Sequence, residues 1–240
     1  MSAHLSGWLA QAWATDSPVL PTASAMQVWL HLGWSVVLAW LGAGLVARLL
    51  AGRAHAVQGQ WVAALALAAW AWVPGSGGAA YWLGLAFQAP SASSVLWCAA
   101  MLATRWRASG SAHGTLRFTG NAMFTDGQSL WLAGLGALLG WALLLDSIAM
   151  LPMQMYAWGF SPWALGLVVL AALLPWVAGR HTARPRGWMA VCVVPLAALV
   201  FVAVRLPTGN VWDAVLDPWV WLALQVGLAR RGWSCYKNNS

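Results

Sequence analysis

Two charged side chains lie inside otherwise apolar stretches of this sequence. Asp146 is part of WALLLDSIAML, and Arg205 is part of FVAVRLP. A charge within an apolar helix is costly unless it is paired, so such a residue indicates either a structural partner or a functional site. The two lie at similar predicted depths, which predicts an ion pair between them. The alternatives are that Asp146 is a hydrogen-bonded structural carboxyl, that it carries a proton or contacts a transported solute, or that it is exposed at the membrane interface.

A polar interruption near the centre divides the apolar stretch between residues 79 and 104. Its sequence is Gln88-Ala89-Pro90-Ser91. Proline has no backbone N–H, so a helix carbonyl one turn earlier, at Ala86 or Phe87, should lose its donor. Broken helices at membrane depth are tolerated inside protein or beside a cavity. We therefore expect Gln88 and Ser91 to face the interior as part of a solute-binding site, or to form an ordinary proline kink.

His31 is the only histidine within a predicted span. A membrane haem with two imidazole ligands needs two such histidines, so that site is disfavoured. The remaining options are a single axial ligand to a pigment or haem, or a hydrogen bond near the membrane interface. The three cysteines form no CxxC motif, which indicates no metal site. The motifs HExxH, GxSxG and GxxxxGK[ST] do not occur, so no catalytic residue is assigned.

The composition shows which kind of element must position these groups. Hydrophobic residues make up 61% of the 240 residues and charged residues only 7%, whereas soluble domains carry roughly 25% charged residues. About 20 apolar residues cross a bilayer as a helix. The sequence therefore predicts an all-α polytopic integral membrane protein with seven transmembrane helices in one bundle. The expected spans are 26–50, 57–72, 79–104, 130–151, 163–179, 188–206 and 218–229.

The basic residues predict the orientation of these spans. All of the 12 Lys and Arg residues except Arg205 fall on one side of the predicted topology: Arg48, Arg53, Arg105, Arg107, Arg117, Arg180, Arg184, Arg186, Arg230, Arg231 and Lys237. Cytoplasmic loops of membrane proteins are rich in Lys and Arg. We expect a bacterial-type inner membrane protein with its N-terminus outside and its C-terminus in the cytoplasm. The lipid bilayer is then its first partner, and the basic residues form no cluster suited to nucleic acid.

Three regions are expected along the chain. Residues 1–25 form an outer-face segment with an interfacial helix, residues 26–229 form the bundle, and residues 230–240 form a cytoplasmic tail. The seventh span is short, at ~18 Å for residues 218–229. It either begins earlier, near Val211, or lies along the membrane surface and leaves six spans. Gly42 with Gly44, and Gly136 with Gly140, indicate positions where helices approach one another closely.

Three classes of function fit these features. A non-catalytic subunit that scaffolds or completes a larger membrane complex is favoured by the missing motifs, the short loops and the apolar aromatic surface. A transporter for a small solute or ion is favoured by Gln88, Ser91, Asp146 and Arg205. An intramembrane enzyme is disfavoured because no nucleophile or metal set is evident, and the protein is therefore expected not to be an enzyme.

Overall fold

The computed structural model describes residues 19–53, 55–109, 127–177 and 188–239, and these residues are helical with short connections. This confirms the predicted helical class for the described part of the chain. The predicted interfacial helix within residues 1–25 falls largely outside these ranges. The cations Arg117, Arg180, Arg184 and Arg186 also lie outside them.

The chain divides into two compact units. The second unit, residues 22–118, contains α2 (Ala23–Leu49), α3 (Ala56–Ala71), the 3-10 turn η1 (Gly75–Gly77), α4 (Ala79–Phe87) and α5 (Ala92–Ser109). The first unit, residues 1–21 and 119–240, contains α6 (Gly127–Ser147), α7 (Met155–Trp158), α8 (Pro162–Val177), α9 (Trp188–Val204), α10 (Val211–Val215) and α11 (Pro218–Asn239). A single bundle over residues 26–229 stays a prediction.

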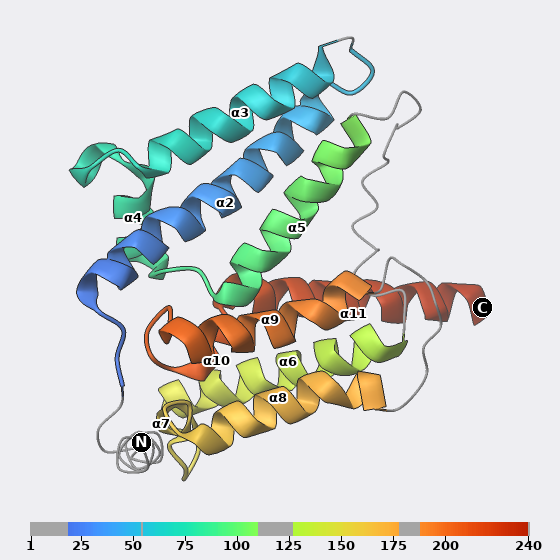
Figure 1. The fold of residues 1–240 in the computed structure, drawn as a ribbon. Coiled ribbons are helices and arrows are strands. Elements are labelled where there is room, and N and C mark those ends of the chain that lie inside the picture. Colours follow the sequence, from blue (N-terminus) through green and yellow to red (C-terminus); the bar gives the residue numbers. More distant parts are fainter. Residues whose placement is uncertain (1–18, 54, 110–126, 178–187, 240) are drawn as a thin grey trace. The chain divides into compact units, whose positions relative to one another are not determined.

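In the second unit, α2 lies between α3 and α5 (Figure 1). The hairpin of α2 and α3 is close because Gly42 has no side chain and Leu67 fills the space beside it. Ser35 donates a hydrogen bond across this contact to the Ala68 carbonyl at 3.1 Å. These contacts confirm that Gly42 lies at a helix–helix interface.

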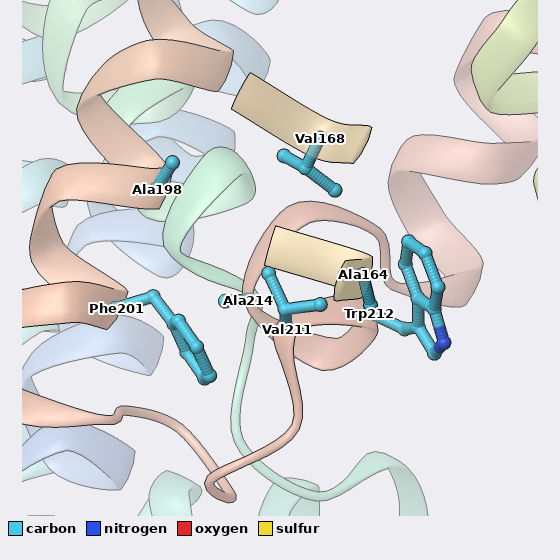
Figure 2. Packing of buried hydrophobic residues seen from close by; sticks show 7 residues of the cluster. All are labelled: Ala164, Val168, Ala198, Phe201, Val211, Trp212 and Ala214. Atoms are coloured by element: carbon cyan, nitrogen blue, oxygen red, sulfur yellow. The ribbon is translucent and has the colours of Figure 1, made fainter. Parts of the chain in front are cut away.

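In the first unit, α6 packs against α11 and α8 packs against α9 (Figure 1). A Cβ on Gly136 would lie 2.7 Å from Cδ1 of Leu224, and a Cβ on Gly140 would overlap the ring of Trp221. Both glycines therefore face α11, as the GxxxG spacing predicted. The main apolar core lies nearby, where Phe201 and Val211 pack with Val168 and Trp212 (Figure 2).

Within the described part of the chain, two helices are long and apolar enough to cross a membrane: α2, and the part of α6 from Leu130 to Ser147. Shorter apolar helices occur at Ala56–Ala71, Pro162–Leu174 and Cys192–Val204. The predicted count of seven spans goes beyond this observation.

The last helix does not begin near Val211, as one interpretation of the sequence had it. Val211–Val215 forms the separate helix α10, because Leu216 has an extended backbone and interrupts the helix. Pro218 then begins α11, where its missing N–H breaks no helical hydrogen bond. The helix continues to Asn239, a length of about 33 Å. It is therefore extended at its C-terminal end and not towards Val211.

Candidate functional site

The interruption at Gln88–Ser91 separates α4 from α5, as the proline predicted. Its position differs from the expected centre of the span. Helix α5 has 18 residues beyond the break and α4 has 9 before it, which correspond to about 27 Å and 14 Å of helix. The break therefore lies well before the middle of this segment.

Two tryptophans of α2 bind the backbone of the break. Trp34 Nε1 donates to the Gln88 carbonyl and Trp29 Nε1 donates to the Pro90 carbonyl, each at 2.9 Å. Both tryptophans are buried, and Trp34 is only 3% exposed. The sequence predicted only that the carbonyl of Ala86 or Phe87 loses its usual helix donor; the structure adds indole donors to the carbonyls of Gln88 and Pro90. The sequence offered no signal for these donors, because they come from 54 and 61 residues away.

The side chains at the break do not all face inwards. Ser91 is 0% exposed, and its hydroxyl accepts a hydrogen bond from the Ser94 N–H at 3.0 Å, which caps α5. The Gln88 side chain is exposed, so the expectation that it faces the interior is wrong. A tight turn at Gln88 accounts for this, since its backbone has φ 63° and ψ −159°. Non-glycine residues rarely adopt this conformation, and it typically costs about 1–3 kcal/mol.

Ser93 adds a polar group at the same break. The residue is 4% exposed, and its hydroxyl is buried with no hydrogen-bond partner. Such a hydroxyl loses hydration without compensation. Ser93 was not among the predicted site residues, although the sequence Ser91-Ala92-Ser93-Ser94 could have suggested it.

Asp146 is a hydrogen-bonded carboxyl, which was the structural alternative to the ion pair. Its Oδ2 accepts a hydrogen bond from the Tyr156 backbone N–H at 2.8 Å, which links the end of α6 to the start of α7. The Arg205 guanidinium lies over the Phe201 ring, 5.2 Å from its centroid. No ion pair joins these two described side chains, so the predicted pair is wrong. Similar depth along the sequence did not bring them together, because each is held by its own local turn.

A hydrogen-bonded network connects the loops around α7 and α10. Asp213 Oδ2 accepts from the Tyr156 hydroxyl at 2.8 Å and from Thr208 Oγ1 at 2.6 Å. Asn210 is fully buried; its amide nitrogen donates to the Tyr156 carbonyl, and its amide oxygen caps the Trp212 N–H, both at 2.9 Å. The bonds between Tyr156 and Asp213 and between Asn210 and Tyr156 join residues 57 and 54 positions apart, so no local sequence pattern predicts them.

Burial and the neighbouring carboxylate change the ionisation of this network. Desolvation, followed by the negative charge and hydrogen bond of Asp213, raises the pKa of the Tyr156 phenol above its usual value of 10.0. The bonds with Asn210 and Thr208 act in the opposite direction. The phenol therefore remains a hydrogen-bond donor to Asp213, which fits a role in holding the loops together.

No family model, curated protein or solved structure matches this chain. The site must therefore be judged on its own geometry.

His31 makes a local hydrogen bond. Its Nδ1 lies 2.8 Å from the Gln27 carbonyl, and since a carbonyl can only accept, Nδ1 carries the proton. The imidazole also lies against the Trp72 ring, with centroids 5.4 Å apart. This leaves Nε2 as the nitrogen with a lone pair in the neutral ring, the arrangement that a metal-ligating histidine uses. Among the described residues no three potential metal ligands gather, and a single-histidine pigment or haem site stays a prediction.

Proposed function

We propose that this protein is a non-catalytic, multi-pass subunit of a larger complex in a bacterial-type inner membrane. The proposal includes seven spans, an outer N-terminus and a cytoplasmic C-terminus. The single observation that carries it is that the backbone carbonyls of the break and the Asp146 carboxylate, where a transport site was predicted, are used in structural hydrogen bonds. The Gln88 and Pro90 carbonyls bind α2 tryptophans, and the Asp146 carboxylate binds the Tyr156 N–H.

The outward surface of α8 is apolar and favours a membrane environment over water. Ala164, Val168 and Ala172 are buried on one side of this helix. The opposite side exposes large apolar groups at helical spacing, namely Trp163, Leu167, Leu170 and Leu174. A water-facing helix carries polar residues on its outer face, whereas this face suits lipid chains or the apolar surface of another membrane subunit.

The decisive experiment is isolation of the tagged full-length protein from native membranes in a mild detergent. Native mass spectrometry then gives the mass and stoichiometry of the particle. The proposal expects a second protein in a fixed ratio that survives repeated purification and dissociates only in harsher detergent. A monodisperse single chain of 25.6 kDa, or its homo-oligomer, would contradict it.

A transporter for a small polar solute is the second candidate, favoured by two features of the break. Gln88 has a strained backbone, and the buried Ser93 hydroxyl has no hydrogen-bond partner. Strained backbone and unsatisfied polar groups recur where ligands bind. A small solute with a hydrogen-bonding group would satisfy the Ser93 hydroxyl.

Ser93→Ala separates the two candidates. The subunit proposal expects Ser93→Ala to assemble normally and to be as stable as the wild type or more stable, because it removes an unsatisfied polar group. If the protein is a transporter, uptake of the small polar solute by reconstituted vesicles should fall in Ser93→Ala while assembly is unaffected. Ser234→Ala is the matched control, since the Ser234 hydroxyl donates to its own helix at the Arg230 carbonyl.

A further inference from the structure

One ring nitrogen of His31 is not used by the fold. Nδ1 is bonded to the Gln27 carbonyl of the same helix, so Nε2, across the ring, points away from the α2 backbone. Apart from that bond and the ring contact with Trp72, the His31 side chain has no hydrogen bond, ion pair or ring contact with any described residue. The Nε2 lone pair is therefore free in the tautomer that the Gln27 carbonyl selects.

A second contact holds the imidazole in this orientation. Helices α2 and α3 are antiparallel, because Gly59 near the start of α3 lies beside Leu50 at the end of α2, whereas Trp72 at the end of α3 lies beside His31. The Trp72 and His31 rings are inclined by 32°. A metal-binding histidine usually has its other ring N–H bonded as Nδ1 is here, because that bond fixes the tautomer and the direction of the lone pair.

The free nitrogen lies in apolar surroundings. Helix α2 is long and apolar enough to cross a membrane. It begins at Ala23, so His31 lies about 12 Å along it. Val28 and Leu32 on α2, and Trp72 from α3, are exposed apolar side chains around it. A ligand of His31 therefore needs a broad apolar surface.

The same face of α2 becomes polar towards the start of the helix. Gln27 and Ser24 lie about one and two turns before His31 on this face, and both are exposed. A ligand with an apolar body and polar groups at one edge fits this order, with its polar edge towards the start of α2.

A bare metal ion does not suit this position. Protein-bound zinc takes three or four protein ligands, and no three potential ligands gather among the described residues. His55, the other histidine in the described part of the chain, precedes α3 at the end opposite Trp72, and the helix between them is about 24 Å long. A metal tetrapyrrole brings four nitrogens of its own and requires only one axial histidine.

We propose that His31 Nε2 is the single axial ligand of a metal tetrapyrrole such as haem. An axial bond is perpendicular to the macrocycle, so the ring lies flat against the face of α2 and covers Val28, Leu32 and Trp72. Its polar edge lies towards Gln27 and Ser24. The proposal rests on the membrane location given under the proposed function, but it requires no second subunit.

The test uses the full-length protein purified in a mild detergent. It is titrated with hemin and, separately, with metal-free protoporphyrin, and the Soret absorbance band is followed. The metal-free ring has the same apolar surface but cannot form an axial bond, so the difference between the two isolates that bond. The variant is His31→Ala. The matched control is His55→Ala, since His55 Nδ1 also has a local contact, 3.1 Å from Gln58 Oε1.

The wild type and His55→Ala are expected to bind one equivalent of hemin with a shifted Soret band. His31→Ala should bind hemin at least about tenfold more weakly, because the metal bond is lost. Metal-free protoporphyrin should bind equally weakly to all three proteins. Imidazole added to His31→Gly should restore the spectrum, and the reduced wild-type complex should bind carbon monoxide, because its sixth coordination position is free.

Two results would overturn the site. They are equal hemin affinities of His31→Ala and the wild type, or equal affinities of the wild type for hemin and metal-free protoporphyrin; either means that an apolar ring partitions without an axial bond. If His31→Ala does not fold, the resonance Raman spectrum of the reduced wild-type complex decides, and the absence of an iron–histidine stretch rejects the site.

Failure of the proposed function is seen separately. A single chain that binds hemin through His31 contradicts the subunit proposal only. A protein with a stoichiometric partner subunit that shows no preference for hemin contradicts the His31 site only.

Discussion

Replacing Gly140 by alanine tests how closely α6 and α11 pack. The space beside Gly140 holds the Trp221 ring, whose Nε1 donates to the Ala137 carbonyl at 3.1 Å. The same ring meets Trp141 edge to face, with centroids 5.2 Å apart. An added methyl group would overlap the Trp221 ring, so the indole must move and lose these contacts.

The magnitude follows from three contributions. Glycine to alanine within a helix stabilises by about 0.5–1 kcal/mol. Overpacking costs about 1–3 kcal/mol, and the lost hydrogen bond costs about 1 kcal/mol. Gly134 is the matched control, because it lies in the same helix and nothing lies within 4 Å of a Cβ placed there. Gly134→Ala should be stabilising, and Gly140→Ala should be less stable than Gly134→Ala by about 2–4 kcal/mol.

Reversible unfolding of the purified protein in mixed micelles measures both free energies. Trp221→Leu in the Gly140→Ala background should recover part of the loss, because the smaller side chain leaves room for the methyl group. The reasoning would be refuted by equal stabilities of Gly140→Ala and Gly134→Ala, or by strict additivity of the changes at positions 140 and 221.

Three other changes address the break, the loop network and the orientation. Trp34→Phe should lower the free energy of unfolding by about 1–3 kcal/mol, because the Gln88 carbonyl loses its indole donor. Tyr156→Phe should be less stable than the wild type at pH 7 by about 0.5–1 kcal/mol. In the wild type, the folded state raises the pKa of the Tyr156 phenol. The stability advantage of the wild type over Tyr156→Phe is therefore fully present below pH 10 and decreases above it. Unfolding measured as a function of pH tests this. An impermeant thiol reagent applied from outside should label Ser76→Cys and not Ser111→Cys.

Each of these expectations has a clear contrary result. Trp131 is 74% exposed, so Trp131→Phe should leave the free energy of unfolding nearly unchanged. An equal loss of stability in Trp131→Phe and Trp34→Phe would mean that the bond to the Gln88 carbonyl does not account for the effect at Trp34. A wild-type advantage over Tyr156→Phe that grows above pH 10 would contradict the bond to Asp213. Reversed labelling of the two cysteines would invert the proposed orientation.

The sequence by itself determined where most helices lie. Their bounds follow from local properties, because apolar length, proline and the basic flanks act within a few residues of each other. Helix α9 begins at Trp188 and α11 begins at Pro218, as predicted. The glycines at 42, 136 and 140 could also be assigned to helix contacts, since a missing side chain permits close approach whichever helix supplies the partner.

Only the tertiary structure decided which groups satisfy one another. The donors to the break, Trp29 and Trp34, and the partner of Tyr156, Asp213, lie more than 50 residues away along the chain. Such pairs depend on how helices rotate and pack, and no local pattern records that. The ion pair expected for Asp146 is not formed for the same reason: similar depth is a one-dimensional property, whereas a hydrogen bond requires a donor within about 3 Å in the right direction.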